Sequence, residues 1–176
     1  MKSIRELRAP PAIVGKVEAI VVRGDSRKPA RFVVETEAIV GVGLADDRLG
    51  GQGEAELSTR QVTLIQQEHL PVIAQLARVE AVDPAALRRN LIISGINLLA
   101  LKNTKLRVGG ALLQIVGPCH PCSRMEESIG KGGYAAMRGH GGMTARVLEG
   151  GLIRKGDPVG LDEHLAARCV ESRSNQ

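Results

Sequence analysis

Short apolar runs separated by glycine-rich turns are the feature that most limits how this chain can fold. Residues 13–22 alternate apolar with polar or small residues, which is the period of a half-buried strand. A second β-rich run, residues 31–40, follows a polar turn, so we expect the two runs to pair as a hairpin with a longer loop. Four later apolar runs have glycine close to one end: 91–94, 111–116, 144–148 and 152–161. Many short strands with glycine turns predict a mainly β fold, a β-barrel with a few α-helical insertions.

Two segments have helical patterning. In residues 66–77, four apolar side chains share one helical face: Leu70, Ile73, Ala74 and Ala77. Asp83 followed by Pro84 is typical of a helix start, so we expect a second, short helix that ends near residue 90. Glycines also crowd residues 130–142, where a mobile loop over a site and a plain linker are both compatible with the composition.

Two of the three cysteines lie close together in the segment Gly117–Glu127, which reads GPCHPCSRMEE. Each follows a proline, and prolines stiffen the chain and bias the preceding residue toward extended geometry. Ser123 lies three residues before Glu126, which is the spacing of a capping box, so a helix is expected to begin after Ser123. The sequence therefore predicts a strand, a stiff turn with Cys119 and Cys122, and a capped helix.

This context makes Cys122 the candidate reactive residue. A helix N-terminus carries partial positive charge and Arg124 adds a full one, and both favour a thiolate over a thiol. A thiolate attacks sulfur or binds a soft metal ion. The alternative is that Cys122 acts only as a small buried hydrophobic residue. The third cysteine, Cys169, lies near the polar C-terminal end and is interpreted as incidental.

Composition narrows the class of partner. The 176 residues suffice for one domain with a sizeable core, and Phe32 and Tyr134 are the only aromatic residues, so the core must be aliphatic. The chain therefore lacks the aromatic platforms on which single-stranded nucleic acids stack, and no nucleic-acid partner is expected. The net charge of +5 comes from scattered basic residues, which suits a small anionic ligand better than a nucleic acid.

The sequence also bears on location. No apolar stretch approaches the ~20 residues needed to cross a bilayer, so no membrane partner is expected. The N-terminal segment MKSIRELRAPP lacks the apolar part of a secretory signal. We therefore expect a cytoplasmic protein, and in that compartment two close cysteines are more often metal-binding or catalytic than structural.

Five segments together resemble a known family. They are, in chain order, GVGLADDRLGG from Gly41, Arg60-Gln61-Val62, Arg89–Gly95, Pro121–Met125, and Ala145–Leu148 with Gly156-Asp157. Their order and spacing resemble the MOSC domain, which occurs at the C-terminus of molybdenum-cofactor sulfurases and as small free-standing bacterial proteins. The resemblance runs from about Ile13 to Leu161. It implies a MOSC domain at 13–165, an N-terminal extension at 1–12 and a polar tail at 166–176.

The resemblance implies the family's β-barrel and an association with molybdenum cofactor, that is, molybdopterin with its metal. Some members bind the cofactor and reduce N-hydroxylated compounds, and others are thought to receive or carry sulfur. The family's cysteine, a molybdenum ligand or a sulfur carrier, falls on Cys122. An oxidoreductase or a sulfurtransferase is therefore expected. Its partners would be a small-molecule substrate or sulfur donor, with an electron-transfer protein or a cysteine desulfurase.

The resemblance also assigns further site residues. The positions expected to bind the cofactor are Asp47, Arg60, Gln61, Arg89, Asn90, Arg124 and Arg146. Arginines there would suit the phosphate of a pterin, because a guanidinium forms bidentate pairs with phosphate. Many members have Gly-Asp-Arg followed by a histidine or aromatic residue, whereas this chain has ADDRL at Ala45–Leu49, which weakens any inference about substrate. Cys119 is a secondary thiol found in some free-standing members.

Three alternatives remain open at this stage. Cys119 and Cys122 have the C-x-x-C spacing of a dithiol redox protein, although they lie outside any βαβ pattern. A zinc site would need two further ligands, and His69 and His140 fit no standard spacing. A non-catalytic module that hands the cofactor to another enzyme is the third. Bound metal and pterin without turnover would favour the module, whereas a persulfide without metal would favour the sulfur carrier.

Overall fold

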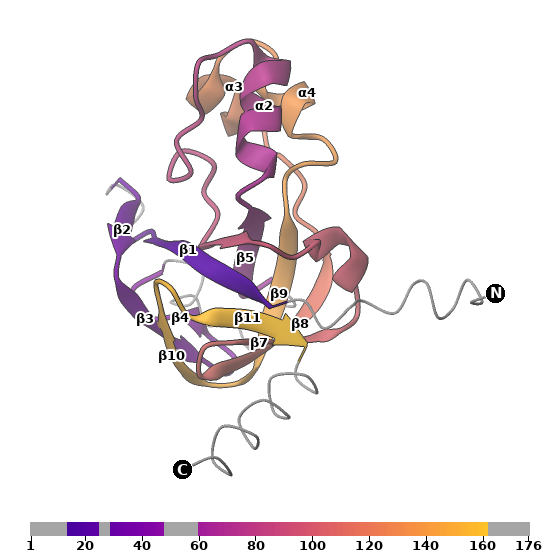
Figure 1. Cartoon of the computed structure of the whole chain (residues 1–176). Helices are drawn as coiled ribbons and strands as arrows, with labels where there is room; N and C mark the ends of the chain where they lie inside the picture. Colours follow the sequence, from indigo (N-terminus) through magenta and orange to yellow (C-terminus); the bar gives the residue numbers. More distant parts are fainter. Residues whose placement is uncertain (1–13, 25–28, 48–59, 162–176) are drawn as a thin grey trace, which may run out of the picture.

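Seven strands close into a barrel in this computed structural model, which describes residues 14–24, 29–47 and 60–161 (Figure 1). The barrel strands are β1 (Gly15–Val22), β5 (Val62–Gln66), β6 (Leu91–Ser94), β7 (Lys105–Val108), β8 (Ala111–Pro118), β9 (Met143–Glu149) and β11 (Pro158–Leu161). Their order is β11-β7-β8-β9-β5-β6-β1, and pairing of β1 with β11 closes the ring. The predicted β-barrel is confirmed. The boundaries expected at residues 12 and 165 lie outside the described residues.

The remaining strands form additions to the barrel. β2 (Arg31–Val33) pairs with β1 outside the ring, and a three-stranded sheet has the order β10 (Gly151–Arg154), β3 (Glu35–Ile39), β4 (Gly43–Leu44). β5 and β6 pair in parallel, whereas the other neighbouring strands of the barrel run antiparallel. A parallel pair needs a crossover connection, and the segment between β5 and β6 contains the helix α2 (His69–Ala77).

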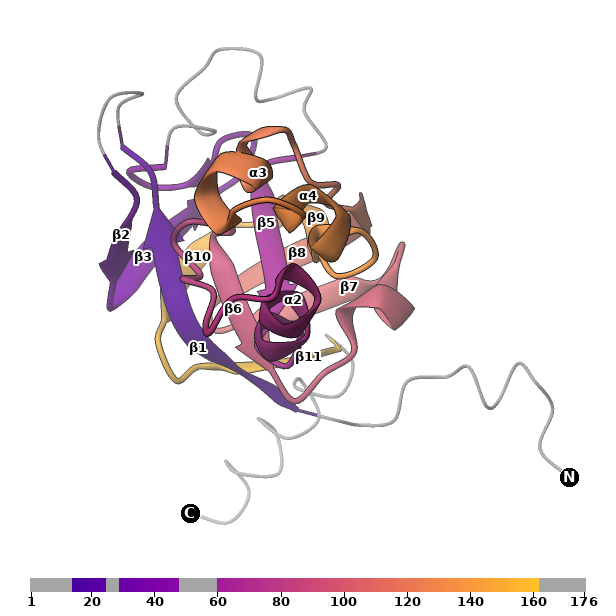
Figure 2. The same ribbon diagram turned by 90° about the horizontal axis from the view of Figure 1, so that it is seen from above.

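Three short helices cover one side of the barrel wall. They are α2, α3 (Arg124–Ile129) and α4 (Gly133–Met137), and Figure 2 shows them over the ends of β5, β6 and β9. A 3₁₀ helix, η2 (Leu98–Leu101), lies between β6 and β7. Among the described residues no helix combines the length and the hydropathy required of a membrane span.

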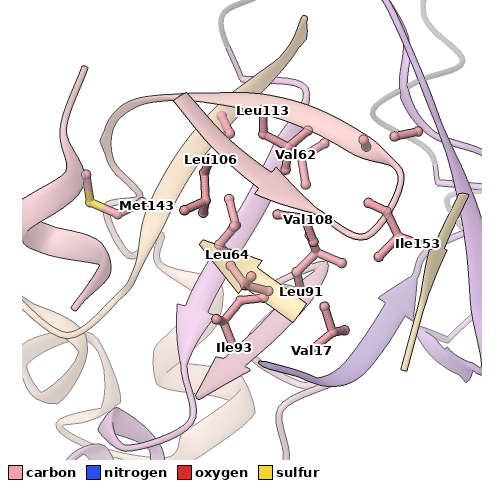
Figure 3. Close-up of a cluster of buried hydrophobic side chains, with 14 of the residues drawn as sticks. Val17, Val62, Leu64, Leu91, Ile93, Leu106, Val108, Leu113, Met143 and Ile153 are labelled. Carbon is pink, nitrogen blue, oxygen red and sulfur yellow. The ribbon is translucent and has the colours of Figure 1, made fainter. Parts of the chain in front are cut away.

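Side-chain alternation divides the core in two. In β5, Leu64 points into the barrel interior and Ile65 points outward to the helices. Figure 3 shows the interior cluster, which is built from aliphatic side chains and Met143. The outer cluster joins Ile65 to Ile73 of α2 and Met125 of α3. Because both faces of β5 are covered, all five of its residues are buried, including the polar Thr63 and Gln66.

The run expected at residues 31–40 serves two sheets. Its first part, β2, pairs with β1 as predicted, with Val33 opposite Ile20 and Arg31 opposite Val22. The chain then bends at Val34, and β3 pairs with β10 and β4 instead. The prediction of a single hairpin strand is therefore wrong beyond Val33. The pattern of apolar residues does not mark the position at which the chain passes from one sheet to the other.

Two other local predictions are wrong. The helix expected after Asp83 is a series of turns: the Asp83 carbonyl accepts from the amide of Ala86, but Arg88 has a φ of 59° and β6 begins at Leu91. Asp83 caps this first turn, but too few residues remain before β6 for a helix to continue. The glycine-rich segment 130–142 is also more than a loop or linker, since it contains α4.

The first turn of α3 differs from the expected capping box. The helix begins at Arg124 as predicted, but the Ser123 hydroxyl makes no capping bond. The carboxylate of Glu126 instead accepts from the backbone amides of Gly132 at 2.7 Å and Tyr134 at 3.0 Å. Glu126 therefore ties α3 to the start of α4, which places the two short helices side by side over the barrel.

This connection predicts an acid-dependent loss of stability. The two amide bonds lower the pKa of Glu126 below its usual value of 4.5. Its contribution is complete above that value and is lost as the pH falls through the lower pKa of the folded state. We expect Glu126→Gln to destabilise the protein at neutral pH, with a difference from wild type that vanishes on acidification. Denaturant unfolding over a pH series measures this, and Glu127→Gln is the control. An equal effect of both variants would contradict it.

Candidate functional site

The cysteine segment leaves the barrel at the end of β8. The amide of Cys119 donates to the carbonyl of Gly142 at 2.9 Å, and the Cys119 side chain is half-buried. Cys122 is exposed, and its carbonyl accepts from the amide of Met125 at 3.0 Å, next to the start of α3. Both thiols are free. The expectation of an accessible Cys122 is confirmed, and its interpretation as a buried hydrophobic residue is wrong.

Arg89 is a buried cation beside this segment. It is 6% exposed, and it donates through Nε to the carbonyl of Gly141 at 2.6 Å, through Nη1 to that of Leu87 at 2.8 Å and through Nη2 to that of Cys119 at 3.2 Å. A guanidinium has five N–H groups, so two have no partner among the described residues. The site thus contains a desolvated positive charge that no carboxylate of the described residues neutralises through a hydrogen bond.

The electrostatic surroundings of Arg89 join the two cysteines to other arginines. Burial lowers the pKa of Arg89 most, and negative charge on Cys119 and Cys122 raises it, while Arg23 and Arg88 lower it. Each of these groups is therefore close enough to Arg89 for its charge to act on the guanidinium. Three arginines and two thiols form one basic, thiol-bearing neighbourhood on the outer wall of the barrel.

Asp47 binds one of these arginines. Its Oδ1 accepts from the Arg23 amide at 2.7 Å and from Nε at 3.1 Å, and its Oδ2 accepts from Nη2 at 2.8 Å. Asp47 is 5% exposed, whereas Asp46 beside it is exposed. The loop acid holds Arg23 in place. Whether Asp47 also binds a cofactor stays a prediction.

Two predicted amide residues are engaged in strand pairing. Asn90 is 0% exposed, and its side chain accepts from the amide of Thr63 at 3.0 Å and donates to the carbonyl of Val21 at 3.2 Å. Gln61 is 4% exposed and accepts from the amide of Val147 at 2.8 Å. These contacts join β1, β5, β6 and β9. The assignment of either amide to the cofactor stays a prediction.

The remaining predicted arginines are exposed in different places. Arg124 is the first residue of α3 and lies two positions after Cys122, so it belongs to the same surface. Arg60 directly precedes β5. Arg146 donates through Nε to Gln114 at 2.7 Å and lies three residues along β9 from Met143, which is paired with Pro118. That is about 10 Å along a strand, so the structure does not bring Arg146 to the thiols.

Sequence reasoning missed four residues of this neighbourhood. Arg23 directly follows β1 and belongs to no motif, so nothing in the sequence marks its approach to Arg89. Arg88 precedes Arg89, and the arginine pair was an available signal. The carbonyls of Gly141 and Gly142 hold Arg89 and Cys119, and a Gly-Gly pair signals such a close approach of backbones.

The structure bears on two of the alternatives, the zinc site and the dithiol redox protein. No group of three potential ligands among His, Cys, Asp and Glu occurs within the described ranges, so zinc lacks a site there. Cys119 and Cys122 are both free thiols that precede α3, so the dithiol alternative stays open.

Comparison with known proteins identifies the family. The sequence profile of the MOSC domain matches residues 45–160, which is more than half of the chain. The chain belongs to the MOSC domain family. The match spans the strands of this MOSC barrel from β5 to most of β11, and it includes the cysteine segment. A comparison with curated proteins gave no match.

Solved structures share the fold of this MOSC protein. The YuaD protein from Bacillus subtilis superposes with a TM-score of 0.71 at 20% identity, over 83% of this chain and 94% of that one. YiiM from Geobacillus stearothermophilus gives 0.66 at 19% identity, over 84% and 74%. YiiM from Escherichia coli gives 0.62 at 21% identity, over 83% and 69%. At these identities the likeness shows the fold alone.

Proposed function

We propose that this MOSC protein binds molybdenum cofactor at Cys122 and uses it to reduce N-hydroxylated small molecules. The observation that carries the proposal is an exposed thiol, Cys122, in the segment whose Cys119 carbonyl binds the buried guanidinium of Arg89, in a family associated with that cofactor. Neither feature alone would be specific. Together they offer a soft ligand for a metal and a fixed positive charge for an anion at one place on the surface.

The side chains present fit the group. Thiolate sulfur is a suitable ligand for a soft metal centre, and Cys122 is free to supply it. The two N–H groups of Arg89 that have no partner among the described residues match the oxygen atoms of a phosphate, and Arg88 adds positive charge nearby. When bound, the cofactor would supply two-electron redox chemistry. Arg89 would orient its anionic part, and the helix layer would shield one side of the site from water.

A second candidate function is sulfur transfer, and the exposure of Cys122 favours it. A carrier thiol must be reached by the donor protein, and an exposed residue meets that need. The Cys122 thiolate would attack the terminal sulfur of a donor persulfide, R–S–SH, forming Cys122–S–SH and releasing R–S⁻. The proposed partners are therefore an electron-transfer protein for the first function and a cysteine desulfurase for the second.

The test compares Cys122→Ser with Cys119→Ser in protein made by a host that synthesises the cofactor. We expect molybdenum and pterin to copurify with wild type and with Cys119→Ser, and to fall at least tenfold in Cys122→Ser. Because Cys122 is exposed, the variant should keep the wild-type circular dichroism spectrum and melting temperature. Elemental analysis, pterin fluorescence and reduction of an N-hydroxylated compound are the measurements.

Each outcome separates the candidates. Metal and pterin that copurify without reductase activity would indicate a cofactor-carrying module. A mass increase of one sulfur atom on Cys122 without metal would indicate the sulfur carrier. Equal metal and sulfur content in wild type and Cys122→Ser would remove the role proposed for this residue.

A further inference from the structure

A pair of histidines meets where the helix layer contacts the segment that holds the site. His69, the first residue of α2, and His140, between α4 and β9, have ring centroids 5.2 Å apart at an interplanar angle of 86°. The Nδ1 atoms of both rings are buried and have no hydrogen-bond partner among the described residues. The sequence separation of 71 positions gave no reason to expect this contact, and neither proposed function uses it.

An unpartnered Nδ1 restricts the charge that each ring can carry here. A neutral imidazole that has its proton on Nε2 leaves Nδ1 as a bare acceptor, which is a modest loss when buried. Protonation would turn the same atom into a charged donor that has no acceptor, which is far more costly. Burial of Nδ1 without a partner therefore favours the neutral form of His69 in this contact. The tautomer is assigned from the hydrogen-bond pattern.

The charged groups around the pair add to this preference. Burial has the largest effect on the pKa of His69 and lowers it. A hydrogen bond with the main chain of His140 raises this pKa. Positive charge on the His140 ring lowers it, and Glu68 raises it. α2 packs against α4 and β5. α4 and its C-terminal end carry the exposed Tyr134 and Arg138, and β5 has no ionisable side chain. Of these groups, the main chain of His140 and Glu68 would stabilise a cation at His69, and the larger effect of burial opposes both.

The segment around His140 connects the pair to the cysteines. The next two residues, Gly141 and Gly142, accept the hydrogen bonds from Nε of Arg89 and from the amide of Cys119. Left-handed glycines flank the histidine, with φ of 82° at Gly139 and 84° at Gly142. Such residues are natural points of rotation, because glycine crosses between backbone regions at little cost. A movement of His140 would therefore displace the two carbonyls that bind Arg89 and Cys119.

We infer that the contact between His69 and His140 is an acid-sensitive latch, which holds residues 138–142 closed over Arg89 and Cys119 at neutral pH and releases them on acidification. The stability contributed by neutral His69 is complete above the pKa of the unfolded state, near 6.5. It is lost as the pH falls below that value toward the lower pKa of the folded state. The latch is independent of which proposed function is correct.

The experiment compares wild type with His69→Phe and His140→Phe, in which an aromatic ring of similar size cannot take up a proton. Between about pH 7.5 and pH 5.5 we expect the melting temperature of wild type to fall by about 3 °C or more beyond the fall in either variant. His120→Gln, which removes an exposed histidine, should keep the wild-type pH dependence. Equal pH dependence in wild type and the Phe variants would overturn the latch.

Two measurements on the wild-type protein keep the inference testable if a variant fails to fold. By NMR we expect His69 to titrate below 6.5, with Nδ1 unprotonated in both rings at neutral pH. Hydrogen exchange of the Cys119 amide, corrected for its intrinsic pH dependence, should lose at least tenfold protection on acidification. Titration of His69 at or above 6.5, unchanged protection of Cys119, or a zinc ion found on the two rings would contradict the latch.

Discussion

Gly142→Ala is expected to lower the free energy of unfolding by about 2–5 kcal/mol, because it combines two costs. Gly142 has a φ of 84°, in the left-handed region that disfavours residues with a Cβ atom. A Cβ placed there would also overlap the backbone carbonyl of Leu64 and approach the Cα of Ile65. These are backbone atoms of β5 in the barrel wall, so they cannot move aside as a side chain would.

Gly139→Ala is the matched control for this substitution. Gly139 lies three residues earlier in the same segment with a nearly equal φ of 82°, but a Cβ atom added there would meet no described atom within 4 Å. Gly139→Ala should lower the free energy of unfolding only by the cost of a left-handed backbone conformation, about 1–2 kcal/mol. Denaturant unfolding of both variants with a common slope measures the difference. Similar losses in the two variants would show that the segment does not pack on β5 as described.

Asp47→Asn is expected to lower the free energy of unfolding by about 3–5 kcal/mol, since it leaves Arg23 without its counter-ion. The side chain of Asp47 is 1% exposed and that of Arg23 is 14% exposed, so water cannot replace the lost charge. Asp46→Asn is the control: this adjacent carboxylate pairs with Arg31 across side chains that are 76% and 58% exposed. Exposed pairs contribute about 0–1 kcal/mol, and asparagine tolerates the φ of 61° at this position.

A double-mutant cycle separates the ion pair from other contacts of Asp47. If the ion pair accounts for the loss, Arg23→Met combined with Asp47→Leu should be less destabilised than the sum of the two single variants, because no charge remains buried. Additive losses, or equal losses in Asp46→Asn and Asp47→Asn, would show that the Arg23 pair does not hold this loop in place.

The two outcomes bear on the proposed site in different ways. Gly142 holds the amide of Cys119, and Asp47 holds Arg23, whose charge acts on Arg89. Both substitutions therefore change what surrounds the thiols without touching Cys122. A variant that folds but loses cofactor would indicate that the arrangement of Arg89 and Cys119, and not the exposed thiol alone, is needed for binding.

Sequence patterns succeeded where a local rule was enough. The period of β1, the glycine after β6 and the apolar run of β8 all predicted strands, and the face of α2 through Ile73 was also correct. These patterns work because a strand or helix must bury one face, and burial leaves a trace in the order of residues. Local context and family resemblance both pointed to Cys122, and the structure shows this residue exposed.

Local rules failed where a neighbour in space decided the outcome. Ser123 had the correct spacing to cap α3, but Glu126 found better donors at Gly132 and Tyr134. Asp47 was expected only as a cofactor-binding residue, but the fold places Arg23 beside it as an ion-pair partner. In each case the side chain could bind water, its own helix or a residue distant in sequence. The sequence alone does not show which of these partners lies within reach.

The sequence by itself determined that this protein has an aliphatic barrel and a cysteine segment that leads from a strand into a helix, because alternation, glycine turns and proline placement are local properties. Only the tertiary structure decided that Arg89 is buried beside both thiols and that His69 meets His140. Those contacts join residues far apart in the chain, and they exist because closing seven strands into a ring fixes which loops share the same side of the barrel wall.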